Sequence, residues 1–310
     1  MKDVAVVIGT YEGADHLAEC LRSLRAQTLA PAEIVIVDAS SNDGTVEIAG
    51  NLGAQTLVLP NNGLGFLYNR GAEQASAPYL LLSNVDVSYD ASCIERLVEA
   101  LEADESRFAA DARQLDWEGV RLVHGLTTLR RGPLLHQYFP GLILDHRVEA
   151  DTVTPTVNAN GAAMLVRRDR FLELGGFDET FFLDWEDLDL CWRAWERGWA
   201  TVYVPDAWLR HRVGAVTSEA MAPRRLASSH HNLMRFALKA LPPAVAGKVI
   251  AGELLRWPRY PSAIGRALGS VVTELPEILR LRQGIRPSRG VFDAMVSDAD
   301  RNAPGTLAAR

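Results

Sequence analysis

The stretch Val4-Ala-Val-Val-Ile-Gly-Thr-Tyr11 is a continuous apolar run that ends in a turn containing glycine. Two later stretches have the same character, namely Glu33-Ile-Val-Ile-Val-Asp38 and Tyr79-Leu-Leu-Leu-Ser83. Such runs are typical of strands that are buried on both faces of a parallel sheet. Apolar residues with helical spacing separate them, at Leu17, Cys20, Leu21 and Leu24 and again at Ile94, Leu97, Val98 and Leu101. This alternation predicts an α/β fold with a mostly parallel central sheet flanked by helices.

The later part of the chain shows weaker signals. Residues 112–157 are harder to read, and within them Leu126–Leu144 mixes glycine, proline, arginine and aromatic residues without a clear period, which predicts a loop-rich insertion near the site. Beyond Met221 the pattern is helical, and prolines at 242, 243, 258, 261, 276 and 287 predict short helices. We therefore expect a main domain over residues 1–220 and a helical C-terminal extension over residues 221–310.

Polar residues stand where three of the predicted strands end. Tyr11 follows the first strand, Asp38 ends the second, and Asp86 follows the strand at Tyr79–Ser83. Ligands of open α/β sheets bind at the carboxyl ends of the strands. We therefore expect these three side chains to share one binding site.

The stretch Gly175-Gly-Phe-Asp-Glu-Thr-Phe-Phe-Leu-Asp-Trp-Glu-Asp-Leu-Asp-Leu-Cys-Trp-Arg193 interleaves carboxylates with large apolar residues. One helical face is apolar and is formed by Leu188, Cys191, Trp192 and Trp195. Glu186, Asp187 and Asp189 occupy the opening turn, where the helix dipole favours anions. Carboxylates at the start of a half-buried helix are candidates for a general base. The alternative is an acidic turn that only complements the dipole.

Composition narrows the class of protein. The chain has 310 residues, of which 48% are hydrophobic, and no apolar run is long enough to predict a transmembrane helix. Its three cysteines are widely spaced and form no CxxC pair, which argues against a disulfide framework or a zinc site. A reducing cytoplasm is the expected location.

Charge is distributed unevenly along the chain. Residues 221–310 hold 14 Lys and Arg against 6 Asp and Glu, a net +8, whereas the whole chain carries −7. This basic extension suits an anionic membrane surface, so we expect peripheral docking on the inner face of the membrane. The alternative is a helical cap that only packs on the main domain. No basic stripe is interleaved with aromatic residues, so nucleic acid is not an expected partner.

Several short motifs occur in the order seen in one enzyme family. They are Val6-Val-Ile-Gly-Thr-Tyr11, Glu33-Ile-Val-Ile-Val-Asp38, Ser41-Asn-Asp-Gly-Thr45, Asn62-Gly-Leu-Gly-Phe66, Asn69-Arg-Gly71, Leu80-Leu-Leu-Ser-Asn-Val-Asp86, Gly161-Ala-Ala-Met-Leu-Val166, Gly176-Phe-Asp-Glu-Thr-Phe-Phe182 and Trp185-Glu-Asp-Leu-Asp-Leu-Cys-Trp-Arg193. Together they resemble the family 2 glycosyltransferases of the GT-A fold, and in particular the rhamnosyltransferase-like branch. The resemblance covers roughly residues 3–215.

The resemblance implies an inverting transfer of a sugar from a nucleotide-diphosphate donor, with Mn²⁺ or Mg²⁺ as cofactor. The implied acceptor is a glycan or a lipid-linked glycan of cell-envelope polysaccharide synthesis, and L-rhamnose from dTDP-rhamnose is the first choice of donor sugar. The residues that it assigns to nucleotide binding are Thr10, Tyr11, Glu12, Asp38, Asn69 and Asn84. It assigns Asp86 and His211 to the metal.

For the chemistry, the resemblance implies Asp187 as the catalytic base with Glu186 beside it. Trp185 is either part of the core or a platform for the acceptor sugar.

Two positions depart from the family pattern. The metal motif is Asn84-Val85-Asp86, which lacks its first acid, and Glu12 stands where relatives often have asparagine.

Two other classes of function compete with this reading. A nicotinamide-dependent oxidoreductase would need GxGxxG after the first strand, and Gly9-Thr-Tyr-Glu-Gly13 does not match it. A non-catalytic nucleotide-sugar or glycan-binding protein on the same scaffold remains as the alternative.

Overall fold

The structure is a computed structural model that describes residues 2–136, 139–214 and 222–297. Its largest element is a sheet of ten strands: β1 (Val4–Thr10), β2 (Glu33–Asp38), β3 (Gln55–Val58), β4 (Tyr79–Asn84), β5 (Val87–Tyr89), β6 (Arg107–Leu115), β7 (Leu122–His124), β10 (Thr154–Pro155), β11 (Ala163–Arg167) and β12 (Ala200–His211). The strand order is β10-β12-β6-β11-β4-β1-β2-β3, with β5 paired to β12 and β7 to β6. The predicted α/β class is confirmed.

The sheet is mixed rather than mostly parallel. Strands β1, β2, β3 and β4 pair in parallel, as the continuous apolar runs predict. Strand β11 then enters antiparallel between β4 and β6, and β6 pairs in parallel with β12. The carboxyl ends of β1 and β4 therefore lie together at one edge of the sheet.

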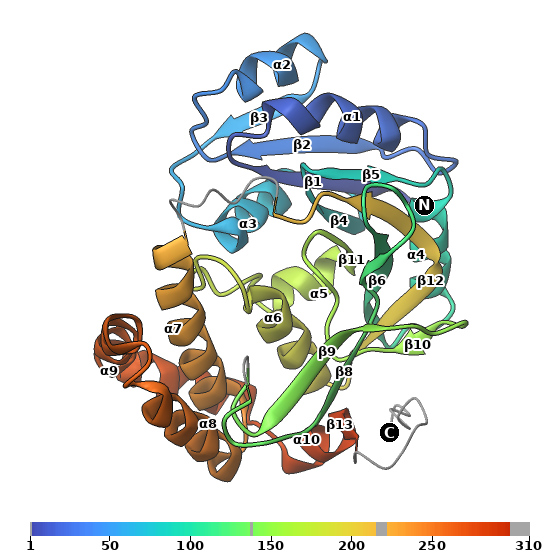
Figure 1. The fold of residues 1–310 in the computed structure, drawn as a ribbon. Helices are drawn as coiled ribbons and strands as arrows, with labels where there is room; N and C mark the ends of the chain where they lie inside the picture. Colours follow the sequence, from blue (N-terminus) through green and yellow to red (C-terminus); the bar gives the residue numbers. More distant parts are fainter. Residues whose placement is uncertain (1, 137–138, 215–221, 298–310) are drawn as a thin grey trace.

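Helices cover both faces of this sheet (Figure 1). They are α1 (Ala14–Arg25), α2 (Thr45–Asn51), α3 (Leu64–Gln74), α4 (Cys93–Glu102), α5 (Arg168–Glu173) and α6 (Glu186–Trp195). Helices α1, α2 and α4 contribute to one buried apolar cluster, and α3, α5 and α6 contribute to the other. Helix α3 can approach β1 closely because residue 71 is glycine: a Cβ there would lie 2.2 Å from Val7 Cγ1. This close packing brings α3 to the edge where the site forms.

The prediction of a loop-rich insertion over residues 126–144 is wrong. Strand β6 continues to Leu115, and β7, β8 (Leu126–Arg131) and β9 (Leu142–Val148) follow it. Strands β8 and β9 form a second sheet together with β13 (Val296–Ser297), in the order β13-β8-β9. One of the two pairing partners of β8 therefore comes from the far end of the described chain, which no local pattern could indicate.

The C-terminal part is helical, as predicted, but three of its four described helices are longer than expected. They are α7 (Ala222–Ala240), α8 (Pro243–Arg256), α9 (Pro261–Ile285) and α10 (Arg289–Met295). Pro276 lies inside α9 and does not end it, while Pro243 and Pro261 begin helices, where a missing N–H has no cost. The expected boundary between residues 220 and 221 lies outside the described residues. Among the helices that the structure describes, none is long and apolar enough to cross a bilayer.

Helix α7 is joined to the acidic stretch by a buried cluster of charges. Lys239 Nζ lies 2.5 Å from Asp178 Oδ2 and 2.8 Å from Asp189 Oδ1. Arg235, whose side chain is fully buried, lies 3.1 Å from Asp178. Burial alone would raise the pKa of Asp178, but Lys239 and Arg235 outweigh it and hold the pKa well below its usual range. A buried charge that loses its partner is strongly destabilising, so this cluster holds α7 against α6.

We expect Asp178→Asn to lower the free energy of unfolding at pH 7 by roughly 3 kcal/mol, because it removes the acid that the two buried cations share. Lys239 then keeps only Asp189 as a buried partner, and Arg235 keeps Glu274 and Glu277. Since the folded-state pKa of Asp178 is depressed, its contribution is present above the unfolded-state pKa and is lost as the pH falls toward the folded-state value. Urea denaturation at several pH values measures both effects.

The control for this experiment is Glu99→Gln, which breaks the exposed pair of Arg96 and Glu99. That change should alter the free energy of unfolding by less than about 1 kcal/mol. An equally small effect of Asp178→Asn would contradict a stabilising role of the cluster.

Candidate active site

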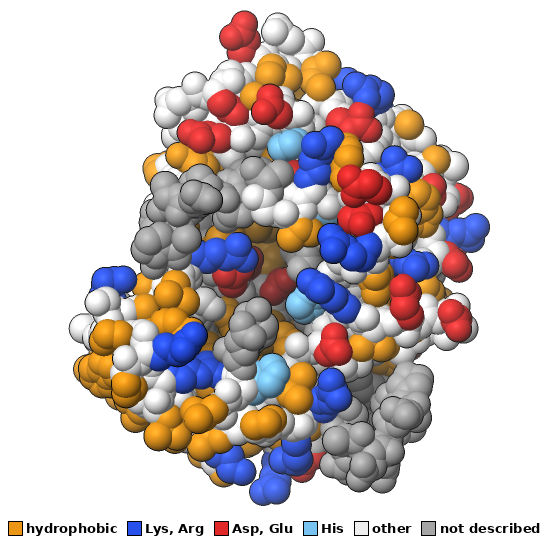
Figure 2. All heavy atoms as spheres, viewed as in Figure 1, with side chains coloured by type: hydrophobic (Ala, Val, Ile, Leu, Met, Phe, Trp, Pro, Cys, Tyr) orange, Lys and Arg blue, Asp and Glu red, His pale blue; other side chains and the backbone are white. Residues whose placement is uncertain are grey.

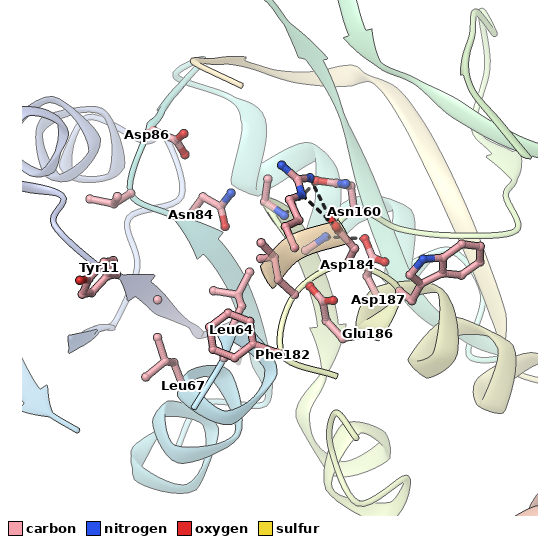
Figure 3. Close-up of a pocket in the computed structure, with 18 of the residues that line it drawn as sticks. Tyr11, Leu64, Leu67, Asn84, Asp86, Asn160, Phe182, Asp184, Glu186 and Asp187 are labelled. Carbon is pink, nitrogen blue, oxygen red and sulfur yellow. Dashed lines mark hydrogen bonds and ion pairs between the residues drawn. The ribbon is translucent and has the colours of Figure 1, made fainter. Parts of the chain in front are cut away.

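A pocket of about 450 Å³ opens at the carboxyl ends of β1 and β4. Figure 3 shows its two walls, with Tyr11 and Asp86 on the side of the β-strands and Glu186 and Asp187 on the side of α6. Four carboxylates line it, from Asp86, Asp184, Glu186 and Asp187. Figure 2 shows acidic side chains at the bottom of the hollow on this face of the molecule.

The first wall contains some of the residues expected to bind the nucleotide. Thr10, Tyr11 and Asn84 line the pocket. Asn84 Oδ1 accepts a hydrogen bond of 3.0 Å from the Tyr68 hydroxyl, which fixes the orientation of the amide. Thr10 Oγ1 is buried and has no hydrogen-bond partner among the described residues.

Three of the expected nucleotide residues do not line the pocket. Asp38 is fully buried, and its carboxylate accepts hydrogen bonds from the backbone N–H and the hydroxyl of Ser41. Asn69 instead bonds both backbone groups of Phe177, accepting from its N–H and donating to its carbonyl. Glu12 is exposed and has a positive φ of 51°. Motif position alone could not separate these local roles from ligand binding.

Asp86 and His211 meet at the same wall. His211 Nε2 lies 3.4 Å from Asp86 Oδ1, and both side chains are nearly buried. His211 Nδ1 lies 2.8 Å from Gln114 Oε1, an oxygen that accepts a hydrogen bond when the proton is on Nδ1. In the neutral tautomer with that proton, Nε2 has a lone pair with which to bind a metal. The pair therefore supplies one oxygen and one nitrogen donor.

This donor set fits a divalent cation that is shared with a substrate. Within the described residues there is no group of three or more His, Cys, Asp or Glu placed to hold a metal. Mg²⁺ and similar cations often take only one or two protein carboxylates and complete their shell with water and substrate phosphates. Asp86 and His211 suit such a shared site, not a metal cage made of protein alone.

The opposite wall begins with a turn in a rare backbone conformation. Asp184 and Trp185 both have positive φ, 68° and 78°, and helix α6 begins directly after them. The turn directs the first two side chains of the helix, Glu186 and Asp187, into the pocket (Figure 3). Sequence periodicity predicted the helix but could not predict the turn.

The two adjacent carboxyl groups have different surroundings. Asp187 Oδ1 accepts a 2.7 Å hydrogen bond from the N–H of Leu188, and Oδ2 accepts one of 3.3 Å from the N–H of Gly161. Burial raises the pKa of Asp187, and these donors together with the Asn158 side chain counteract that rise. Glu186 Oε2 is buried with no hydrogen-bond partner among the described residues. Burial and then the charges of Asp187 and Asp184 raise the pKa of Glu186 well above its ordinary value.

Trp185 lies between the pocket and the core. It lines the pocket, and its ring packs edge-on against Phe139 with centroids 5.2 Å apart. Phe236 of α7 also packs against the Trp185 ring, with centroids 6.0 Å apart. The two readings of Trp185 from sequence, core residue or platform, therefore do not exclude each other.

Sequence reasoning missed several residues of the pocket and its support. Arg225 of α7 lines the pocket and binds Asp184 through two hydrogen bonds of 2.9 and 2.8 Å. Asn160 also lines it, and Gln114 Nε2 donates to Asn160 Oδ1. Each comes from a segment whose approach to the pocket depends on long-range packing, so no local motif marks it.

Comparison with known proteins shows which family of enzymes this chain is similar to. Residues 5–145 match the sequence model of the family described as Glycosyl transferase family 2. An N-acetylglucosaminyl-diphospho-decaprenol L-rhamnosyltransferase of Mycobacterium tuberculosis is 29% identical over 74% of this chain and 82% of its own. A glucosyl-dolichyl phosphate glucuronosyltransferase of Haloferax volcanii is 24% identical over 68% of this chain and 69% of its own.

Solved structures show the same fold. S. aureus TarS in complex with UDP aligns with a TM-score of 0.52 and 19% identity, over 95% of this chain and 83% of that chain. The mannosyltransferase PcManGT from Pyrobaculum calidifontis, in complex with GDP-Man and Mn²⁺, aligns with a TM-score of 0.53 and 14% identity, over 94% and 82%. The fold is thus that of the GT-A glycosyltransferases. The family match and the M. tuberculosis relative bear out the resemblance to family 2 glycosyltransferases, and to their rhamnosyltransferase-like branch, that is seen in the motifs.

The surroundings of Glu186 predict an unusual dependence of stability on pH. Its carboxyl binds a proton more tightly in the folded state than in the unfolded state, so stability falls as the pH rises above the unfolded-state pKa of about 4.3. We expect Glu186→Gln to be more stable than the wild type at pH 8 and to lose this advantage near pH 4. Melting temperatures across that range measure the difference.

A matched control is Glu105→Gln, at an exposed position outside the pocket. Its difference from the wild type should not vary with pH. If Glu186→Gln followed the wild-type pH curve, Glu186 would not be an unpaired buried acid.

Proposed function

We propose that this chain is an inverting, metal-dependent glycosyltransferase that moves a sugar from a nucleotide-diphosphate donor to a hydroxyl of a glycan or lipid-linked acceptor in cell-envelope polysaccharide synthesis. L-Rhamnose from dTDP-rhamnose is our first choice of donor. The observation that carries the proposal is the arrangement of Asp86 with His211 on one wall of a single pocket and Asp187 with Glu186 on the other. Inverting transfer needs charge stabilisation at the leaving group and a base on the opposite side of the sugar.

The donor would bind along the wall formed by the strands. Thr10, Tyr11 and Asn84 would contact the nucleotide, and Thr10 Oγ1 still has hydrogen-bonding capacity to offer. The other residues that the family motifs assign to the nucleotide, Glu12, Asp38 and Asn69, would act indirectly by shaping the loops behind this wall. A diphosphate would then lie near Asp86 and His211.

Asp86 and His211 would hold the divalent cation, Mn²⁺ or Mg²⁺. When bound, that cation would neutralise the negative charge of the leaving diphosphate. The contact of His211 Nδ1 with the side chain of Gln114 orients the imidazole ring so that Nε2 lies on the side of Asp86.

Asp187 would act as the base. Burial raises the pKa of both carboxyl groups, but the hydrogen bonds from Gly161 and Leu188 favour the ionised form of Asp187, which a base requires, whereas Glu186 Oε2 has no donor among the described residues. Asp187 takes the proton from the acceptor hydroxyl as that oxygen bonds to the anomeric carbon. The bond from this carbon to the diphosphate breaks, and the nucleoside diphosphate leaves with the electron pair.

The nature of the acceptor and of the sugar rests on the relatives. The M. tuberculosis relative is named for transfer of L-rhamnose to N-acetylglucosaminyl-diphospho-decaprenol, and the H. volcanii relative for transfer to a glucosyl-dolichyl phosphate. Both names describe a sugar added to a lipid-linked acceptor. Trp185 beside Asp187 offers an aromatic surface on which an acceptor sugar would stack.

We further propose that the helical C-terminal extension, which we place at residues 221–310 after a main domain over residues 1–220, docks peripherally on an anionic inner leaflet from the cytoplasm. Figure 2 shows apolar side chains over α8 and α9 with Lys and Arg among them. The exposed apolar residues are Leu254, Leu255, Trp257, Val272, Leu275 and Leu279. Arg259, Arg266 and Arg280 are exposed near them, while the acidic Glu253 is buried against Arg256. This combination suits an anionic lipid surface.

Donor binding and turnover test the enzymatic proposal together. A ligand at about 100 times Kd stabilises a protein by about 2.7 kcal/mol, so at equal concentration the tightest-binding donor gives the largest rise in melting temperature. We expect that donor to be dTDP-rhamnose with Mn²⁺. Asp187→Asn should keep this shift and lose at least about a hundredfold in transfer, and Glu186→Gln should lose less. Asp86→Ala should lose the part of the shift that depends on Mn²⁺.

Three outcomes would count against this assignment. Normal transfer by Asp187→Asn but not by Glu186→Gln would exchange their roles. Normal transfer by both variants would remove the base from this turn altogether. A donor-induced shift in the wild type without transfer or donor hydrolysis would support the alternative, a non-catalytic nucleotide-sugar or glycan-binding protein.

Vesicle binding tests the membrane proposal. The full chain should co-sediment with phosphatidylglycerol-containing vesicles more than with pure phosphatidylcholine vesicles, and binding should weaken with salt, since each basic residue near the surface contributes about 1 kcal/mol. Trp257→Ala combined with Leu255→Ala should reduce binding. Val120→Ala, at an apolar residue that is 82% exposed on the β6–β7 turn, is the matched control. Equal binding to both kinds of vesicle would contradict the proposal.

A further inference from the structure

The turn that directs Glu186 and Asp187 into the pocket is not self-supporting. Asp184 and Trp185 both adopt positive φ, a region that side chains with a Cβ rarely occupy. Two such residues in succession persist only where the surrounding structure holds them in place. The origin of that support decides which residues position the catalytic carboxylates.

Helix α7 supplies the support from one face. Its residues 225, 229 and 232 follow the spacing i, i+4, i+7, which places them along one side of a helix. Arg225 binds the Asp184 carboxylate through two hydrogen bonds, and Trp185 Nε1 lies 3.5 Å from Ser229 Oγ. Phe236, one turn beyond residue 232, packs against the Trp185 ring.

Asn232 makes the most direct contact with the backbone of the turn. Its Nδ2 donates to the carbonyl oxygen of Leu183 at 2.9 Å and to that of Asp184 at 2.8 Å. Asn232 is fully buried, so removal of its amide leaves two carbonyl oxygens of the turn without this buried donor. At the other end of the amide, Oδ1 lies 2.9 Å from His231 Nδ1, while His231 Nε2 lies 2.9 Å from Glu274 of α9.

We propose that Asn232 is a positioning residue of the transfer reaction. Its hydrogen bonds to the carbonyl groups of Leu183 and Asp184 hold the turn that places Asp187 in the pocket. This inference rests on the proposed function for its catalytic consequence. Asn232 is a stronger candidate than Arg225, because the side chains of Arg225 and Asp184 are 47% and 31% exposed and their attraction is screened by solvent. Part of the active site is thus organised from the C-terminal helices.

The test compares Asn232→Ala and the isosteric Asn232→Asp with Met234→Ala in the full chain. Met234 is equally buried on α7 but packs against residues of α9, so its truncation loosens the helix without touching the turn. For both Asn232 variants we expect kcat to fall at least about tenfold, because small displacements of a catalytic group are costly, while KM for the donor stays within about threefold. Hydrogen exchange in a peptide that spans residues 183–188 should speed up.

A second-site variant tests the cause directly. Glycine adopts positive φ without steric cost, so in the Asp184→Gly background the turn should depend less on its support. The loss of kcat caused by Asn232→Ala should therefore be smaller there than in the wild type, a coupling that a double-mutant cycle measures.

Several results would overturn the inference. Unchanged kcat and unchanged exchange at residues 183–188 in Asn232→Asp would do so even if Asn232→Ala did not fold. A loss of kcat in Met234→Ala as large as in the Asn232 variants would assign the effect to general packing. If the wild type transferred no sugar from any donor, the proposed function would fail, and the exchange measurement would still decide whether Asn232 holds the turn.

Discussion

The buried contact of Lys239 with Asp178 and Asp189 is the interaction on which the rest of the structure depends. The acidic stretch carries more carboxylates than a buried segment can tolerate, because unpaired charges are very costly to bury. Lys239 and Arg235 neutralise the two acids that face the core. Of the other four acids in the stretch, Asp184, Glu186 and Asp187 line the pocket, and Glu179 pairs with Arg70. One stretch thus supplies carboxylates both to the charge cluster under α7 and to the pocket.

The predictable part of the fold was the part made of local signals. Strands β1, β2 and β4 are continuous apolar runs and are buried on both faces, so their pattern alone indicated a parallel sheet. Strands β8 and β9 were missed because exposed arginines and a mixed composition hide their period, and because β8 pairs with β13 across most of the chain. Pro276 contributed to the wrong prediction of short helices. The surrounding helices keep α9 continuous at this position, where a proline would end an isolated helix.

The same distinction applies to the site. Motif order predicted Asp86, His211, Glu186 and Asp187, and the structure brings all four to one pocket. Motif order could not show that Asp38 binds Ser41 and that Asn69 binds the backbone of Phe177. A polar side chain at a strand end or in a helix suits either such a structural role or ligand binding. Arg225 and Asn232 were not predicted, since their partners in the Asp184 turn are about 40 residues away in sequence. Contacts of this kind follow from helix packing alone.

The pairing of β13 with β8 also affects how the protein forms during its synthesis. Strands β1 to β4 can pair as soon as the first third of the chain has left the ribosome, since domains fold from the N-terminus as they emerge. Strand β8 cannot pair with β13 until residues near the end of the described chain have been synthesised. Until then, the backbone N–H and C=O groups along one edge of β8 are unpaired. Strand β9, whose Leu144 lines the pocket, is paired to β8. A nascent chain would therefore form the pocket wall made by the strands well before its pocket is closed, and the unpaired edge of β8 would be exposed in the interval.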